Sequence, residues 1–483
     1  SRRAKYDICH FRGDGEKWHN GLQKTSLFCR GFRGSGRRRI TACEGVMIMR
    51  RSKSAFILFV FLVLLSAAAA GDFIREQRTA QEARAAEASY VLLSWNDLGM
   101  HCYNRDFQDL AVLPPYNTLW AQVVKAGDPP QIVTDGVRVE YSFPDNTYSV
   151  GKSNFWEYDQ ALFGVDLAPN VGLTGNGLAG EMARSGDHFI AEGIPLTEFR
   201  DSDPASPYPY QLAQVVAYDS ASGKELARST VVAPVSTEMN CDDCHHDGGV
   251  EGIATGRVET NILTLHDDEN DEEYPPGYAG GLMANRPVLC ADCHASNALG
   301  TSGVPGIPNL SRAMHETHDE EVDSNLEGCY QCHPGPQTQC LRDVMSTEHE
   351  MECVDCHGNL NQVADNPQPW LQEPRCDNED CHGAGYAQDQ PLYRNSKEHG
   401  GIYCAACHDS PHAIAPGRER NDGIKFRDLQ GFYDTLQTCT VCHLTMPQEA
   451  GPHGAAAPPQ PTRTPLPVVP TDFNFLPVVT VGD

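Results

Sequence analysis

The chain has 483 residues, 40% of them hydrophobic, and its formal net charge at pH 7 is −28. This length allows two or three domains. The negative charge argues against nucleic acid and anionic lipid surfaces as partners, and it favours cations, metal ions and basic redox proteins.

The first 70 residues predict an export signal preceded by non-native sequence. The apolar run 55–65 follows basic residues and precedes Ala68 and Ala70, a pattern typical of a secretory signal peptide. We predict a signal peptide over residues 47–70, and residues 1–46, which are basic and patternless, as upstream reading frame. A run of eleven residues is too short to span a bilayer, so no transmembrane span is expected after cleavage. The remaining chain carries a balance of −38.

Residues 71–235 contain no Cys-x-x-Cys-His motif and are predicted to form a β-rich domain after a short polar helix at 77–88. Turn-forming residues separate the strand-like segments, which suggests a sandwich or small barrel. The domain could be a docking or polymer-contact module, or a lid over the region that follows. The expected strands are 91–95, 119–124, 137–143, and the hairpin 212–218 with 227–232 around Ser222-Gly223.

Seven times between residues 241 and 443, a pair of cysteines is closed by a histidine. Cys-x-x-Cys-His is the attachment signature of c-type haem, in which the thiols become thioethers and the histidine an axial iron ligand. A single copy could be half of a zinc site or a redox dithiol, but zinc needs paired knuckles and a redox dithiol does not repeatedly precede His. The sequence therefore predicts seven c-type haems as cofactors. The motifs are Cys241/Cys244/His245, Cys290/Cys293/His294, Cys329/Cys332/His333, Cys353/Cys356/His357, Cys376/Cys381/His382, Cys404/Cys407/His408 and Cys439/Cys442/His443.

The fifth motif is wider than the others, because four residues separate Cys376 from Cys381. Its terminal Cys-His is intact and a longer loop can still reach both vinyl positions, so we expect haem there too. The alternative is one loose thiol and a surface histidine. Two further cysteines, Cys102 and Cys340, lie outside the motifs, and in an oxidising compartment they predict a disulfide, with two independent thiols as the alternative.

Residues 236–455 are rich in Gly, Pro, Asn and Asp, which predicts short helices and loops around the haems, with little regular secondary structure. The fold class expected is therefore a β-rich N-terminal domain followed by a multihaem c-type cytochrome domain. The acidic residues within 267–273 are expected to form a solvated face. The tail, 456–483, is Pro-rich and ends in a β-prone segment that could add to a sheet edge.

The sixth position of each iron separates an electron carrier from a catalyst, because two histidines saturate the iron and an empty position admits substrate. From residue 71 onward ten histidines lie outside the motifs, enough for all seven sites. His315 and His318 are expected on one helical face, serving different haems, and His399 and His412 to serve neighbouring haems. His266 and His453 are placed in polar loops. The remaining candidates, in order, are His349 and His246, then His101 or Met100, whereas His188 is expected to be structural.

At these residues the chain resembles a family of exported multihaem c-type cytochromes from metal-reducing bacteria. The resemblance covers residues 90–455 and implies a secreted, extracellular or outer-surface protein, with the periplasm as the alternative. Some members polymerise into filaments that carry electrons to minerals, electrodes or partner cells. The wide fifth motif and the Pro-rich tail depart from the pattern. The matching strings include NDLGMHC, LPPYNTLWAQV, NILTLHD, AMHETH, HGGIYCAACHDSPHAI and GPHG.

The leading hypothesis is an electron-transfer protein rather than an enzyme, with closely spaced bis-His haems. Its expected partners are redox partner cytochromes, extracellular metal oxides or electrodes, and further copies of itself as a homopolymer. The alternative is a multihaem reductase of a nitrogen or sulfur oxyanion with one open haem. Such enzymes often replace a motif His by Lys, whereas all seven motifs here end in His. A third reading makes the β-rich domain an adhesin stiffened by haems.

Overall fold

The computed structural model describes residues 90–270, 274–368, 371, 374–448 and 451–454, all of which belong to one compact unit. The predicted signal peptide, the segment before it, the helix 77–88 and the tail 456–483 lie outside the described residues. Within the described part of the chain, no helix is both long and apolar enough to cross a membrane.

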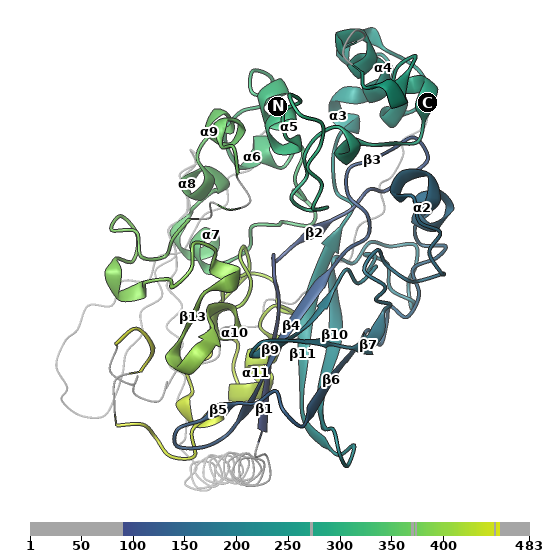
Figure 1. Ribbon diagram of the computed structural model, residues 1–483. Helices are drawn as coiled ribbons and strands as arrows, with labels where there is room; N and C mark the ends of the chain where they lie inside the picture. The colour runs from purple at the N-terminus through teal and green to yellow at the C-terminus, as the bar shows by residue number, and fades with distance from the viewer. Residues whose placement is uncertain (1–89, 271–273, 369–370, 372–373, 449–450, 455–483) are drawn as a thin grey trace, which may run out of the picture. The chain divides into compact units, whose positions relative to one another are not determined.

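Residues 90–236 are β-rich, as predicted, and form two five-stranded sheets (Figure 1). The first has the order β1-β4-β9-β8, with β5 paired to β4, and the second the order β2-β11-β10-β6-β7. Neighbouring strands are antiparallel, except for the parallel pair β2–β11. The strands are β1 (Tyr90–Asn96), β2 (His101–Cys102), β4 (Thr118–Lys125), β5 (Gln131–Ile132), β6 (Val137–Ser142), β7 (Ala179–Glu181), β8 (Ala183–Ser185), β9 (His188–Glu192), β10 (Tyr210–Asp219) and β11 (Glu225–Ser236).

The two sheets share one apolar core, which makes the domain a sandwich. Leu92 and Val123 from the first sheet and Val139 and Val215 from the second belong to the same buried cluster. In β6, buried and partly exposed residues alternate, the pattern of a strand with one face in the core. The β10–β11 hairpin turns at Gly223, whose φ of 69° explains why glycine stands there.

From residue 241 onward the chain consists of short helices and loops, as predicted (Figure 1). Among the described residues of this region, the longest helix has 13 residues. Two strand pairs are present: β3 (Leu110–Ala111) with β12 (Val288–Leu289), and β13 (Lys397–Glu398) with β14 (Ile402–Tyr403). The α-helices are α2 (Phe155–Phe163), in the β-rich region, then α3 (Asp242–His245), α4 (Val258–Asn270), α5 (Leu310–Thr317), α6 (Leu326–Cys329), α7 (Val344–His349), α8 (Cys353–His357), α9 (Leu360–Asp365), α10 (Cys404–His408) and α11 (Ile424–Gln430).

A buried ion pair within the region of the motifs is hydrogen-bonded to the β-rich region. The Arg342 guanidinium donates to both carboxylate oxygens of Asp422, at 2.7 and 2.9 Å, and to the carbonyl of Gly99 at 2.9 Å. Its side chain is only 1% exposed and that of Asp422 2%. Two charges so deeply buried are tolerated because each satisfies the other with two parallel hydrogen bonds.

The predicted disulfide between Cys102 and Cys340 is not formed, and both residues are free thiols. Cys340 Sγ instead lies 4.0 Å from Nδ1 of His412, and Cys102 lies on the short strand β2 beside β11. Burial raises the pKa of the Cys340 thiol to about 11, and burial followed by the charge of Cys340 raises that of Cys102 further. The structure thus has the alternative arrangement, two independent thiols held protonated.

Candidate functional site

A single helical turn shapes most of the Cys-x-x-Cys-His motifs. The backbone N–H of the motif histidine donates to the carbonyl of the first cysteine in the first, second, third and seventh motifs, at 2.8 to 3.0 Å. The fourth and sixth motifs form the helices α8 and α10. Residues three and four positions apart lie on one face of a turn, so both thiols and the imidazole point the same way. This is the arrangement that attachment to one porphyrin requires.

The fifth motif forms its turn differently, because of the extra residues between its cysteines. Cys381 and Gly383 donate their N–H groups to the carbonyl of Asn378, each at 3.0 Å. The turn therefore begins two residues after Cys376. It preserves the Cys381-His382 end of the motif and leaves Cys376 on a wider loop.

The second cysteine of four motifs is exposed, and Cys244 of the first motif is one of them. Cys244 is a free, exposed cysteine, whereas Cys241 is partly buried. The physical reason is that α3, which carries Cys244, buries none of its residues, so no apolar side chain of that helix covers the thiol. Haem attachment at Cys244 therefore stays a prediction, at a site that opens to solvent. The other exposed second cysteines are Cys332, Cys356 and Cys381.

Cys244 nonetheless lies close to a second motif. Its backbone N–H donates to the carbonyl of Cys241 at 3.4 Å, which keeps it in the turn of the first motif. Burial, followed by the charge of Cys244, raises the pKa of the Cys332 thiol. The second cysteines of the first and third motifs are therefore neighbours.

Six of the seven motif histidines face a second imidazole. Two imidazoles that share one metal ion through bonds of about 2.0 Å hold their ring centres roughly 6 Å apart. The observed separations have this value, so each pair leaves room for one metal ion. The pairs are His245–His318 at 6.3 Å, His294–His266 at 6.3 Å, His333–His315 at 6.1 Å, His357–His412 at 6.1 Å, His443–His399 at 5.9 Å and His408–His453 at 5.9 Å.

Hydrogen bonds at Nδ1 orient several of these rings. Nδ1 of His315 lies 2.7 Å from the carbonyl of Ser311, and Nδ1 of His318 lies 2.6 Å from that of Met314. His294 makes the same kind of bond, at 2.9 Å, to Pro308. Because a carbonyl only accepts, Nδ1 carries the proton and Nε2 keeps its lone pair. Metal-ligating histidines characteristically have this second bond, which fixes the ring and its tautomer.

The surroundings also keep the paired imidazoles neutral. Burial, followed by the neighbouring imidazole of His453, lowers the pKa of His408 to about 4. Burial, followed by His357, lowers the pKa of His412 to about 3. A metal ligand must be the unprotonated ring, so both residues are ready to coordinate at neutral pH.

These pKa shifts predict acid sensitivity. A histidine whose pKa is lower in the folded than in the unfolded chain loses folding stability as pH falls from about 6.5 toward the folded pKa, since only the unfolded chain takes up the proton. Between pH 7 and pH 5, His408 and His412 are each expected to lower the free energy of unfolding by about 1–2 kcal/mol. Guanidinium unfolding midpoints at the two pH values measure this loss. The exposed His349→Ala variant should show the same dependence, and a midpoint that rises at pH 5 would contradict the expectation.

Several sequence expectations about the second histidines agree with this geometry. His315 lies in α5 and His318 ends it, and they pair with different motifs. His399 and His412 flank the sixth motif but pair with other motifs. His399 faces His443 of the seventh motif, and His412 faces His357 of the fourth. One expectation was wrong: His266 lies in the helix α4 and not in a polar loop, because the apolar residues of NILTL pack inward.

His382 of the fifth motif lacks an imidazole partner among the described residues. Its ring instead lies 5.1 Å from the ring of Tyr386, which lies 5.0 Å from that of His453. Every histidine after residue 70 lies among the described residues. We expected the ten histidines outside the motifs to provide a partner for all seven motif histidines, and this expectation fails at His382.

The four remaining histidines lie elsewhere. Nε2 of His101 lies 2.9 Å from Asp97, and His188 is stacked on Trp120 at 4.4 Å, in the structural role expected. His246 and His349 are exposed, and in the described part of the chain neither faces a motif histidine. Sequence reasoning ranked these four below the six that form pairs, but it could not assign the pairs, because each pair joins residues distant in the chain.

A cluster of buried aromatic residues borders three of the motifs. Trp95 and Trp120 belong to an apolar cluster packed against Cys376, Cys404 and Cys442. The indole N–H groups of both tryptophans are buried and have no hydrogen-bond partner in the described residues. A buried indole N–H normally finds an acceptor. Two orphaned donors beside three motif cysteines therefore fit a large, partly polar group such as haem.

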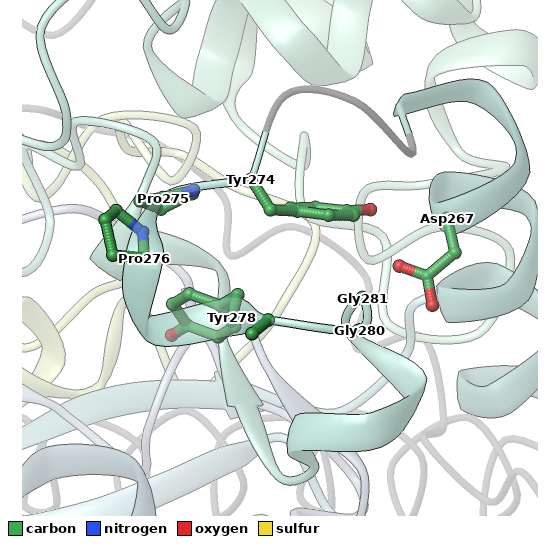
Figure 2. Close-up of a pocket in the computed structure, with 8 residues that line it drawn as sticks. Asp267, Tyr274, Pro275, Pro276, Tyr278, Gly280 and Gly281 are labelled. Carbon is green, nitrogen blue, oxygen red and sulfur yellow. The ribbon is translucent and has the colours of Figure 1, made fainter.

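Two tyrosines that contact the second site line a cavity that sequence reasoning did not single out. It has a volume of about 450 Å³, and Figure 2 shows the Tyr274 ring reaching across it toward Asp267. The Tyr274 hydroxyl lies 2.8 Å from Nδ1 of His266, and the Tyr278 hydroxyl donates to Asp292, within the motif, at 2.7 Å. The two tyrosines thus contact the second site through hydrogen bonds. In the sequence, the only indication of the cavity was the YPPGY segment that carries them.

We call each motif, together with any histidine that faces it, a site, and number the sites by their motifs. The first three sites are neighbours. The helix α4 carries His266 of the second site, and its Asn261 side chain donates to the carbonyl of His245 in the first site at 2.9 Å. The helix α5 then joins the first site to the third, since His318 and His315 belong to these two pairs.

The chain of neighbours continues from the third site to the fifth. The backbone N–H of Leu326, in α6 of the third site, donates to Glu352 at 2.9 Å, and Glu352 begins the helix α8 of the fourth site. Burial, then Asp343 and the nearby thiol of Cys381, raise the pKa of the Cys356 thiol. Because the thiol of Cys381 influences the pKa of Cys356, the fourth and fifth sites lie close together.

The last three sites follow in the same way. The ring of Tyr386 lies between His382 of the fifth site and His453 of the sixth. The backbone N–H of Leu436, just before the seventh motif, donates to the carbonyl of Cys407 at 2.9 Å. The sites therefore form one series in the order second, first, third, fourth, fifth, sixth, seventh.

Comparisons of the chain with models of known families, with curated proteins and with solved structures found no match.

Proposed function

We propose that this chain is a heptahaem c-type cytochrome that transfers electrons along a series of closely spaced haems. The observation that carries the proposal is the set of six imidazole pairs, each joining a motif histidine to a distant one at about 6 Å. Haem would supply one-electron redox chemistry, and saturation by two imidazoles would restrict it to that chemistry. The chain's own residues attach the haems, orient the imidazoles and set the order of the sites.

The continuous order of the sites supports transfer over the whole series, because each site has a neighbour on the next helix, turn or aromatic ring. Electrons would enter or leave near the second and the seventh sites, at the two ends. The acidic surface favours basic redox proteins and metal ions as partners over anionic ones.

Electron paramagnetic resonance at low temperature tests the coordination. The oxidised protein should show low-spin ferric signals from six of its seven haems, since bis-imidazole ligation gives low-spin iron. Predominantly high-spin signals would contradict the proposal, because they would mean that the histidine pairs do not hold the iron.

The unpaired His382 favours a second candidate function, a reductase with one open haem. Nitrite added to the reduced protein decides between the two. The electron-transfer proposal predicts that the haems stay reduced, and steady oxidation with consumption of nitrite would establish the reductase.

The same site bears on polymerisation. In a filament, one haem would take its second histidine from the next subunit, and the fifth site lacks one of its own in the described residues. We include an exported, filament-forming cytochrome, serving extracellular metal oxides or electrodes, as the finer form of the proposal. Negative-stain microscopy of secreted protein should show filaments. Uniformly monomeric particles at high concentration would contradict filament formation.

A further inference from the structure

We propose that the fifth site of the single chain is a binding site for a small neutral ligand, such as carbon monoxide or nitric oxide, and that it discriminates against anions. The inference rests on the proposed function, since it requires haem at the fifth motif. It goes beyond it by assigning a ligand class to one site of the series, a property that electron transfer alone does not require.

The first step is the coordination of His382. Six motif histidines face a second imidazole, and His382 faces none in the described residues, so a haem there would have one axial position free of protein ligands. Tyr386 does not fill that position. Its ring centre lies only 5.1 Å from that of His382, too close for a metal ion to lie between the imidazole and the phenol oxygen.

The second step is access. His382, Cys381 and Tyr386 are all exposed, and Tyr386 retains 46% of its surface. A small molecule can therefore reach this site from solvent without displacing core residues. The sixth site, its neighbour, differs because His408 is half-buried and already faces His453.

The third step is charge, which selects among small ligands. The fifth motif reads CDNEDCH, and its Glu379 and Asp380 are exposed directly before Cys381. The described residues give neither carboxylate a cationic partner, whereas Asp377 is paired with Arg375 at 2.8 Å. Two uncompensated negative charges within the fifth motif lower the local concentration of anions around the site and leave neutral molecules unaffected. The same charges make the site unsuitable for oxyanion substrates.

Two titrations of the dilute, intact protein test the proposal. Carbon monoxide added to the reduced protein should bind with a stoichiometry of one per seven haems, and azide added to the oxidised protein should bind weakly. In the double variant Glu379→Gln/Asp380→Asn, azide affinity should rise about three- to tenfold at low ionic strength, with most of the gain lost in 0.5 M salt, and carbon monoxide affinity should not change.

The matched control is Glu320→Gln/Glu321→Gln, which removes two exposed acidic residues near the first site. It should leave both titrations as in the natural protein. The Cys376→Ser/Cys381→Ser variant should keep six haems and lose the carbon monoxide. If that variant does not fold, the azide response of the Glu379/Asp380 variant still locates the site.

Three results would overturn the inference: no carbon monoxide bound by the dilute chain, its retention in the six-haem variant, or an azide affinity indifferent to both carboxylates. Should the chain still carry seven haems, six of them low-spin, the proposed function would stand while this inference fails. Loss of carbon monoxide binding only at high protein concentration would support it, because a second copy would then be closing a site that is open in the single chain.

Discussion

Replacing His318 by alanine is expected to open the first haem site to carbon monoxide without changing the number of haems. His318 faces the motif histidine His245 at 6.3 Å, and its Nδ1 is fixed by the carbonyl of Met314. The variant keeps both thioethers and the motif histidine and loses only the second axial ligand. The reduced variant should therefore bind two molecules of carbon monoxide per chain, where the natural protein binds one at the fifth site. A carbon monoxide titration followed in the Soret band measures the difference.

His349→Ala is the matched control, because His349 is exposed and faces no motif histidine in the described residues. It should bind carbon monoxide as the natural protein does. If the His318 variant bound no more carbon monoxide than this control, the pairing inferred for the first site would be wrong. The other five pairs would then be in doubt as well, because they rest on the same separation of the ring centres.

Replacing Asp422 by alanine is expected to lower the free energy of unfolding by about 3–5 kcal/mol, because it leaves the guanidinium of Arg342 buried without a counter-charge. Arg342 also donates to Gly99 and Cys340, so its strain would reach both regions that it connects. Guanidinium unfolding followed by far-ultraviolet circular dichroism gives the change in midpoint.

Asp428→Ala provides the comparison, since Asp428 pairs with Arg427 at 2.6 Å on the surface, with exposures of 43% and 39%. Surface pairs contribute about 0–1 kcal/mol, so its midpoint should barely move. Equal shifts in the two variants would show that burial does not give the Arg342–Asp422 pair its importance.

Local patterns in the sequence predicted most of the fold. Alternating apolar residues located the long strands of the sandwich, and the Gly/Pro-rich composition indicated short helices after residue 241. These features depend on neighbours within a few positions. The short strands β2 and β3 were not predicted, because two residues carry no periodicity and their pairing partners β11 and β12 are far along the chain.

The candidate site was likewise predicted where it depends on local spacing and not where it depends on tertiary packing. The motif residues follow from spacing alone, and so did the six histidines that form pairs. Their partners did not, because pairs such as His245 with His318 depend on tertiary packing. Burial depends on it as well, so spacing could not distinguish the exposed Cys244 from the partly buried Cys241.

The two cysteines outside the motifs illustrate the same limit. Cys102 and Cys340 predicted a bond because they are the only spare thiols after the predicted signal peptide. Both are free, and Cys340 faces His412 instead. Counting cysteines gives the number of candidates for a disulfide, whereas only packing brings two of them within bonding distance.

Haem content tests the central claim most directly. A pyridine haemochrome assay on the mature, purified chain, set against its protein concentration, should give seven covalently bound haems per polypeptide, six of them inert to carbon monoxide after reduction. A content markedly below seven, or carbon monoxide binding to most of the reduced irons, would contradict it.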